Sequence, residues 1–161
     1  MTFLARCVIS VFISAVIVFG QSLLVPPSRT DLTTPGVFSV SIDSPSGKAP
    51  VALQWEFSVP PVIVLSTADI TIGKAAESAR KSLTCATKAN KPAIQRRIRF
   101  VCILAGGQAP ITNGPIALVH YRAQWDVKGA QIRVALENIF GASADLKLIP
   151  IPNVDEIIDL R

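Results

Sequence analysis

Side chains that could carry out chemistry are few in this chain of 161 residues. The single histidine, His120, lies on a run in which apolar residues alternate with polar ones, beside Arg122 and Gln124. A serine–histidine–aspartate triad assembles in space, so sequence spacing alone does not exclude one. The chain lacks the Gly-x-Ser-x-Gly turn that presents many nucleophilic serines. We therefore expect His120 to be a solvated strand residue, and a hydrolase stays the enzymatic alternative.

Acidic residues indicate neither a catalytic pair nor a metal site. Those nearest the predicted strands and turns are scattered: Glu56, Asp69, Glu77, Asp126, Glu137 and Asp145. Two carboxylates could meet as in a glycosidase, but their spacing does not require it. No loop has the alternating acidic residues of a calcium site, and one histidine with two inward cysteines gives no zinc set. We expect no catalytic residue, no metal and no cofactor.

Cys85 and Cys102 are the cysteines outside the first 20 residues. Each lies on the apolar side of an alternating run. In an oxidising compartment such a pair predicts a disulfide, which would stabilise the fold by about 3 kcal/mol. The alternative is a pair of buried free thiols.

The N-terminal segment has the pattern of an export signal. A short start with one positive charge at Arg6 precedes an apolar run that ends at Gly20. We predict a signal peptide over residues 1–20, and a secreted or otherwise extracytoplasmic protein, in a periplasm or on a cell surface. The alternative is an uncleaved anchor reaching Val25, the one case in which we expect a membrane contact. Residues 21–36 hold several prolines and predict a flexible tether.

The remaining residues, 37–161, predict one all-β domain. The clearest strand covers residues 51–59, where five apolar positions alternate with four others. Similar runs recur every 8 to 15 residues with turn residues between them, and only residues 73–80 could form a helical turn. About nine strands with this spacing indicate an antiparallel β-sandwich.

Four of these stretches resemble the cohesin family. They are S-P-S-G-K-A-P-V-A-L-Q-W-E-F-S-V, I-R-F-V-C-I-L-A-G, I-T-N-G-P-I-A-L-V-H-Y-R-A and G-A-Q-I-R-V-A-L-E-N-I-F-G-A-S-A-D. The resemblance implies a jelly-roll sandwich without catalytic activity, related to some carbohydrate-binding modules, whose family partners in cellulosome scaffolds are dockerins. The chain departs from the family where Ser58-Val59-Pro60-Pro61 follows an early strand, and in its two cysteines.

Two surfaces are candidates for binding. The exposed positions of the two best strands form a candidate binding face of Gln54, Glu56, His120, Arg122 and Gln124. Between residues 74 and 99 the chain has eight cations and one acid, Glu77. This segment predicts a basic patch for an acidic partner, made of Lys88, Lys91, Arg96, Arg97 and Arg99. Its alternative is a solubilising loop whose charges protect an edge strand.

The partner class follows from the aromatic residues and the export signal. Trp55, Tyr121 and Trp125 fall on the apolar sides of their runs, which disfavours a flat sugar-stacking platform and leaves Phe140 as the free ring. Nucleic acid is excluded because no aromatic residues are interleaved with the cations. We expect extracytoplasmic recognition of a protein, such as a dockerin-like module, or of a polysaccharide. The alternative is a structural subunit of the cell envelope that pairs edge to edge.

Overall fold

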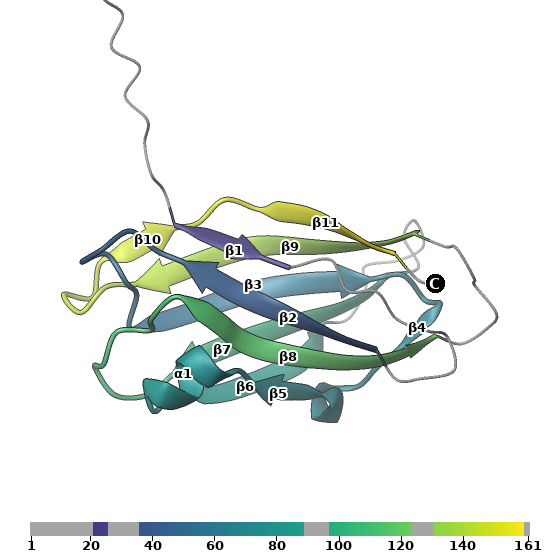
Figure 1. Ribbon diagram of the computed structural model, residues 1–161, viewed down its shortest axis with the longest axis horizontal. Helices are drawn as coiled ribbons and strands as arrows, with labels where there is room; N and C mark the ends of the chain where they lie inside the picture. Colours follow the sequence, from purple (N-terminus) through teal and green to yellow (C-terminus); the bar gives the residue numbers. More distant parts are fainter. Residues whose placement is uncertain (1–20, 26–35, 89–96, 124–130, 160–161) are drawn as a thin grey trace, which may run out of the picture.

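The computed structural model describes residues 21–25, 36–88, 97–123 and 131–159, and these form a β-sandwich of two antiparallel sheets (Figure 1). The described residues contain eleven strands, one short α-helix and one 3-10 turn. The predicted all-β sandwich is confirmed. The strand count exceeds the expected nine partly because short strands add to the edges of both sheets.

The six-stranded sheet contains the longest strand of the molecule, β9 (Gln131–Ala142). Its order is β10 (Leu148–Pro150), β9, β3 (Ala52–Val59), β7 (Ile98–Ala105) and β6 (Ser82–Lys88), and β11 (Val154–Asp159) also pairs with β9. The middle strand β3 is therefore flanked by β7 and β9, and β6 ends the sheet on one side.

The five-stranded sheet is built around β8 (Gly114–Ala123). It runs from β1 (Ser22–Leu24) through β2 (Gly36–Asp43) to β8, which then pairs with β4 (Ile63–Val64) and β5 (Ile70–Ile72). The 3-10 turn η1 (Thr67–Asp69) precedes β5, and helix α1 (Lys74–Ser78) follows it. The helical turn predicted at residues 73–80 is confirmed.

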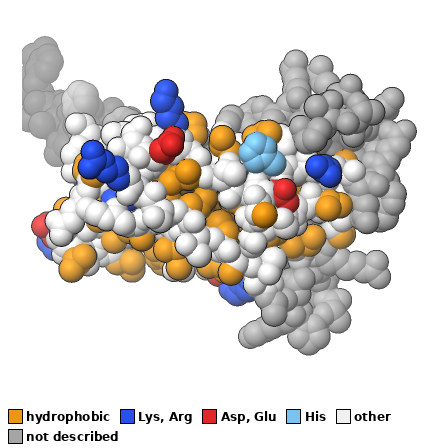
Figure 2. Space-filling model, turned by 90° about the horizontal axis from the view of Figure 1, so that it is seen from below, with side chains coloured by type: hydrophobic (Ala, Val, Ile, Leu, Met, Phe, Trp, Pro, Cys, Tyr) orange, Lys and Arg blue, Asp and Glu red, His pale blue; other side chains and the backbone are white. Residues whose placement is uncertain are grey.

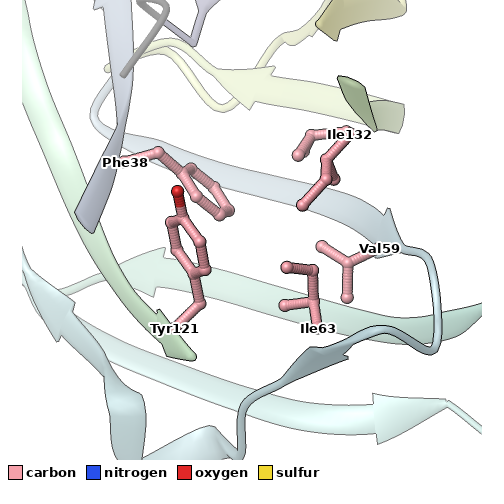
Figure 3. Close-up of a pocket in the computed structure, with 6 residues that line it drawn as sticks. Phe38, Val59, Ile63, Tyr121 and Ile132 are labelled. Carbon is pink, nitrogen blue, oxygen red and sulfur yellow. The ribbon is translucent and has the colours of Figure 1, made fainter. Parts of the chain in front are cut away.

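The core between the sheets is aromatic at its centre. Trp55, Phe57 and Phe100 are buried, and the rings of Phe57 and Phe100 stack with centroids 4.9 Å apart. Phe38 and Tyr121 come from the opposite sheet and point toward each other, as Figure 3 shows. Burial of such side chains removes roughly 150 to 250 Å² each from water, which makes them the main source of stability. The inward positions predicted for Trp55 and Tyr121 are confirmed, whereas Trp125 lies outside the described residues.

One glycine is needed for this packing. A Cβ atom on Gly36 would lie 2.3 Å from Cζ of Tyr121. Real Cβ contacts are never that short, so any larger residue at position 36 would displace the Tyr121 ring from the core. The Tyr121 ring thus lies over Gly36, its partner in the register of β2 and β8, and leaves no room for a side chain there.

One sequence prediction needs correction. The tether expected over residues 21–36 contains strand β1, which pairs with β2 and buries Leu23 and Val25 completely or almost so. Short apolar runs near proline or turn residues do not reveal from periodicity alone whether they pair with a sheet. The predicted signal segment lies outside the described residues.

Candidate functional site

The structure divides the predicted binding face between two opposite sides of the molecule. Gln54 and Glu56 lie on β3, on the outer surface of the six-stranded sheet. His120 and Arg122 lie on β8, on the outer surface of the five-stranded sheet. Since the two sheets form different layers, these residues cannot make one face, and that part of the prediction is wrong. Gln124 lies outside the described residues.

Glu56 is also less accessible than its alternation indicated. Only 7% of its surface is exposed, and Lys88 Nζ from β6 donates to its Oε1 at 2.6 Å. A central strand is covered by long side chains from both neighbours, even on the side that faces away from the core. Glu56 therefore forms a buried ion pair with Lys88, whose own side chain is 44% exposed.

Arg97 fixes the end of β3 from the same side. Its Nε donates to Ser58 Oγ at 3.0 Å, and its Nη2 donates to the carbonyl oxygens of Ser58 at 2.9 Å and Arg133 at 2.6 Å. Partial burial lowers the pKa of Arg97, although the nearby carboxylates of Asp155 and Glu137 oppose this effect. The planar guanidinium is suited to this role because it offers several donors in fixed directions.

Arg99 completes the set of cations on this surface. Its Nη2 lies 3.6 Å from Glu137 Oε2 on β9, an exposed pair that contributes little to stability. The described members of the predicted basic patch, Lys88, Arg97 and Arg99, thus contact their own sheet. Lys91 and Arg96 lie outside the described residues, and the attraction of an acidic partner stays a prediction.

A row of exposed side chains crosses the same sheet next to these charges. Phe140, Gln54, Ile103 and Thr84 are paired in register across β9, β3, β7 and β6. Phe140 is 38% exposed and Ile103 is 47% exposed. We call these four residues the apolar row and the neighbouring Glu56, Lys88, Arg99 and Glu137 the charged group. The alternation of Ile103 with the inward Cys102 and Leu104 was visible in the sequence and could have identified it.

Lys81 is a buried cation whose hydrogen bonds stabilise the fold. Its side chain is buried, and its Nζ donates to the carbonyl oxygens of Gly106 at 2.6 Å and Gly107 at 3.0 Å. Burial lowers the pKa of Lys81. Both carbonyls follow β7, so this lysine ties the start of β6 to the end of β7.

On the opposite side, His120 lies in a shallow hollow of about 320 Å³ that Val64, Asp69 and Arg122 also line. Its Nε2 is 3.4 Å from Thr71 Oγ1. Asp69 Oδ2 accepts hydrogen bonds from both the backbone N–H and the hydroxyl of Ser66, each at 2.7 Å, and these bonds lower the pKa of Asp69. Ser66 therefore donates to the carboxylate, whereas a triad needs the serine to face the imidazole.

A second hollow, a groove, lies among loops at one end of the sandwich. It has a volume of about 950 Å³, and its lining includes Pro45, Lys48, Pro110 and Ile149. None of the described residues that line it is aromatic. Sugar recognition generally relies on exposed aromatic rings, so the groove has no stacking surface for a polysaccharide.

Cysteine chemistry in the described residues is structural. Cys85 on β6 and Cys102 on β7 form a disulfide with sulfur atoms 2.02 Å apart, as predicted. Among the residues that the structure describes, no three His, Cys, Asp or Glu side chains gather into a metal site. Nor does any described helix have the length and hydropathy needed to cross a bilayer.

Comparisons with known proteins identify the architecture. No family model matches the chain, and no curated protein matches it. Solved structures do match: a cohesin in a cohesin–dockerin complex from Clostridium thermocellum superposes with a TM-score of 0.67 over 88% of this chain and 99% of that one, at 12% identity. The fold is cohesin-like.

Two further structures agree with this result. A non-cellulosomal cohesin from Archaeoglobus fulgidus has a TM-score of 0.64 and 10% identity, over 88% of this chain and 91% of that chain. The third cohesin of ScaC from Acetivibrio cellulolyticus, solved with a ScaB dockerin, has a TM-score of 0.66 and 11% identity, over 87% and 98%. These superpositions establish the cohesin-like fold that the sequence motifs predicted. At sequence identities this low, they establish nothing beyond the fold.

Proposed function

We propose that this chain is an exported, non-catalytic module that binds a protein partner of the dockerin type on the outer surface of its six-stranded sheet. The observation that carries the proposal is the apolar row beside the charged group. Ile103 and Phe140 present apolar surface to solvent toward one end of the sheet, and the ion pairs of Glu56 with Lys88 and of Glu137 with Arg99 lie next to them on the same surface. Protein interfaces combine such an apolar centre with a polar rim.

The rigidity of this surface also favours a protein ligand. Lys88 and Arg97 both bond to the middle strand from the outer surface, and the disulfide joins β6 to β7. A preorganised surface loses less conformational entropy when a partner binds, so the same contacts give higher affinity. Several of the similar solved cohesins were crystallised with dockerins, which supports a partner of that class.

Carbohydrate recognition has weaker support. Of the described aromatic rings, Phe140 is half-exposed, and the others are buried: Phe38, Trp55, Phe57, Phe100 and Tyr121. One ring does not form a platform for stacked sugars. Export is supported by the composition of residues 1–20 and by the paired cysteines, since disulfides persist in oxidising compartments.

The test compares the two outer surfaces with matched substitutions. Ile103→Asp removes the apolar row from the six-stranded side, and Val37→Asp places the same charge on the five-stranded side, where Val37 is 40% exposed. The domain is immobilised, and extracellular proteins of the source cells are captured and identified by mass spectrometry. We expect Ile103→Asp to weaken capture of a specific protein about 30-fold or more, and Val37→Asp to leave it unchanged. Equal effects of the two variants, or retention of polysaccharide alone, would reject the proposal.

A further inference from the structure

The outer edge of β6 has backbone groups that no other strand in the described residues uses. β6 is the terminal strand of its sheet and pairs only with β7. Cys85 lies directly opposite Cys102, and their Cα atoms are 4.1 Å apart. This short spacing marks a non-hydrogen-bonded pair, in which both residues direct their N–H and C=O groups away from each other. Cys85, and with it Leu83 and Thr87 at two-residue spacing, therefore directs its backbone donors and acceptors outward.

This edge lacks the usual protection against strand addition. Natural edge strands are blocked by charged side chains, prolines or bulges. Between Ser82 and Thr87 the sequence has no charge and no proline, and its pairing with β7 is continuous over all seven residues. Lys88 is turned to Glu56 and Lys81 to the carbonyls of Gly106 and Gly107, so neither lysine covers the outward backbone. The sequence analysis gave as an alternative that charges in this segment protect an edge strand. These two lysines do not have that role.

The edge is also held straight. The disulfide fixes its centre to β7, and Lys81 fixes its start. In the other sheet, β5 and η1 lie along the same side of the molecule, at the bottom of Figure 1. Figure 2 views this side and shows apolar and uncharged atoms over much of it, with several Lys, Arg, Asp and Glu side chains and the histidine among them. An extended segment placed here would meet backbone donors already in position.

The charges near the start of β6 indicate which kind of peptide segment would bind at this edge. Arg80 is exposed just before β6, and within the described residues no acidic side chain forms an ion pair with it. Lys81 has only carbonyl partners, so its charge is not neutralised by an acid. Glu77 is the one acidic residue between positions 74 and 99. The excess positive charge favours a ligand with carboxylates.

We propose that the β6 edge is a second binding site, which accepts an extended acidic segment of a partner protein as an added strand. The added strand exchanges main-chain hydrogen bonds with Leu83, Cys85 and Thr87. Its carboxylates approach the exposed Arg80 at the start of β6. This site is separate from the sheet surface of the proposed function, because an edge binds through backbone in the plane of the sheet and the apolar row binds through side chains above it.

The first test uses amide hydrogen exchange on the full domain. The probe is the capped peptide Asp-Val-Thr-Val-Thr-Val-Asp, and its matched control has lysine in place of both aspartates. In the free protein we expect the amides of Leu83, Cys85 and Thr87 to exchange faster than those of Thr84 and Ala86, which face β7. The acidic peptide should slow exchange at the three outward amides and should bind about tenfold more tightly than the lysine peptide at low salt. Unchanged exchange, or equal binding of both peptides, would overturn the proposal.

The second test removes one outward donor. Thr87→Pro deletes an N–H that makes no bond within the sheet, and Thr87→Ala is its control. We expect Thr87→Pro to weaken the acidic peptide about fivefold to tenfold and Thr87→Ala to change binding less than about twofold. Circular dichroism checks the fold, and the wild-type exchange data decide the question if the proline variant does not fold. Ile103→Asp should leave peptide binding intact, which separates this site from the proposed function. If analytical ultracentrifugation shows that the protein self-associates through β6, the edge binds a second copy of the chain and the proposal is rejected.

Discussion

The two outer surfaces of the sandwich differ in how far the molecule has fixed them. On the six-stranded side, an ion pair, an arginine bound to two carbonyls and a disulfide join β6, β7, β3 and β9. On the five-stranded side, His120 and Arg122 lie around a hollow, where Ser66 donates to Asp69 three residues further along the chain. Asn113 joins Asp43 and Ser44 at the end of β2, but no ion pair or disulfide is found among the described residues of this side. This difference is the reason that we propose the six-stranded side as the binding surface, because a preorganised surface loses less conformational entropy when a partner binds.

Of the changes that test this difference between the two sides, loss of the disulfide should lower the stability of the protein most. Cys85→Ser with Cys102→Ser opens a link across 17 residues of sequence separation. We expect the free energy of unfolding to fall by about 3 kcal/mol, measured by urea denaturation monitored by tryptophan fluorescence. Reduction of the wild type under native conditions should give the same loss. A change below about 0.5 kcal/mol in both experiments would show that β6 is held by its hydrogen bonds alone.

Breaking the Glu56–Lys88 pair from one end should have an intermediate effect. Lys88→Met leaves a carboxylate that is 7% exposed without its cation, and we expect a loss of about 1 to 3 kcal/mol. The matched control, Arg122→Met on the five-stranded side, should change stability by less than about 0.5 kcal/mol, since Arg122 is exposed.

A double variant sharpens the same comparison. Glu56→Leu with Lys88→Met removes both charges, and we expect most of the stability to return because no unpaired charge stays buried. If the double variant is as unstable as Lys88→Met alone, the pair acts through packing and the electrostatic explanation is incorrect.

The smallest effect is expected from Asp69, on the less fixed side. Hydrogen bonds from Ser66 lower the pKa of Asp69 in the folded protein. A folded pKa below the unfolded value stabilises the protein above the unfolded pKa, and the stabilisation is lost as the pH falls through the folded pKa. Because Asp69 lies at the surface, where solvent screens its interactions, we expect less than about 0.5 kcal/mol. Urea denaturation at pH 6 and pH 3 should show Asp69→Asn less stable than the wild type at pH 6, with a smaller difference at pH 3.

Strand content and the inward residues were predictable from the sequence. Alternation places Trp55 and Tyr121 inside because a strand turns successive side chains to opposite faces, and this rule needs no knowledge of neighbours. The disulfide followed from two inward cysteines on neighbouring strands. The same rule could not reveal that Gln54 and His120 lie on opposite sides of the molecule, since it does not say which strands share a sheet.

Long-range contacts account for the remaining errors. Glu56 was expected to be exposed, but Lys88 reaches it from a strand 32 residues away. β1 was expected to be a tether because its three residues are too few to show a period, and its pairing with β2 becomes evident only in three dimensions. Lys81 gave no sequence signal at all, since its partners are the backbone carbonyls of two glycines.

The apolar row and the charged group lie at different heights along the same strands, so the six-stranded surface has a top and a bottom. If the surface is rotated by 180° about the sheet normal, the apolar row falls where the charged group was. The surface therefore has no two-fold symmetry. A ligand whose two halves differ would therefore dock in one orientation, and the attached polypeptide would always leave in the same direction.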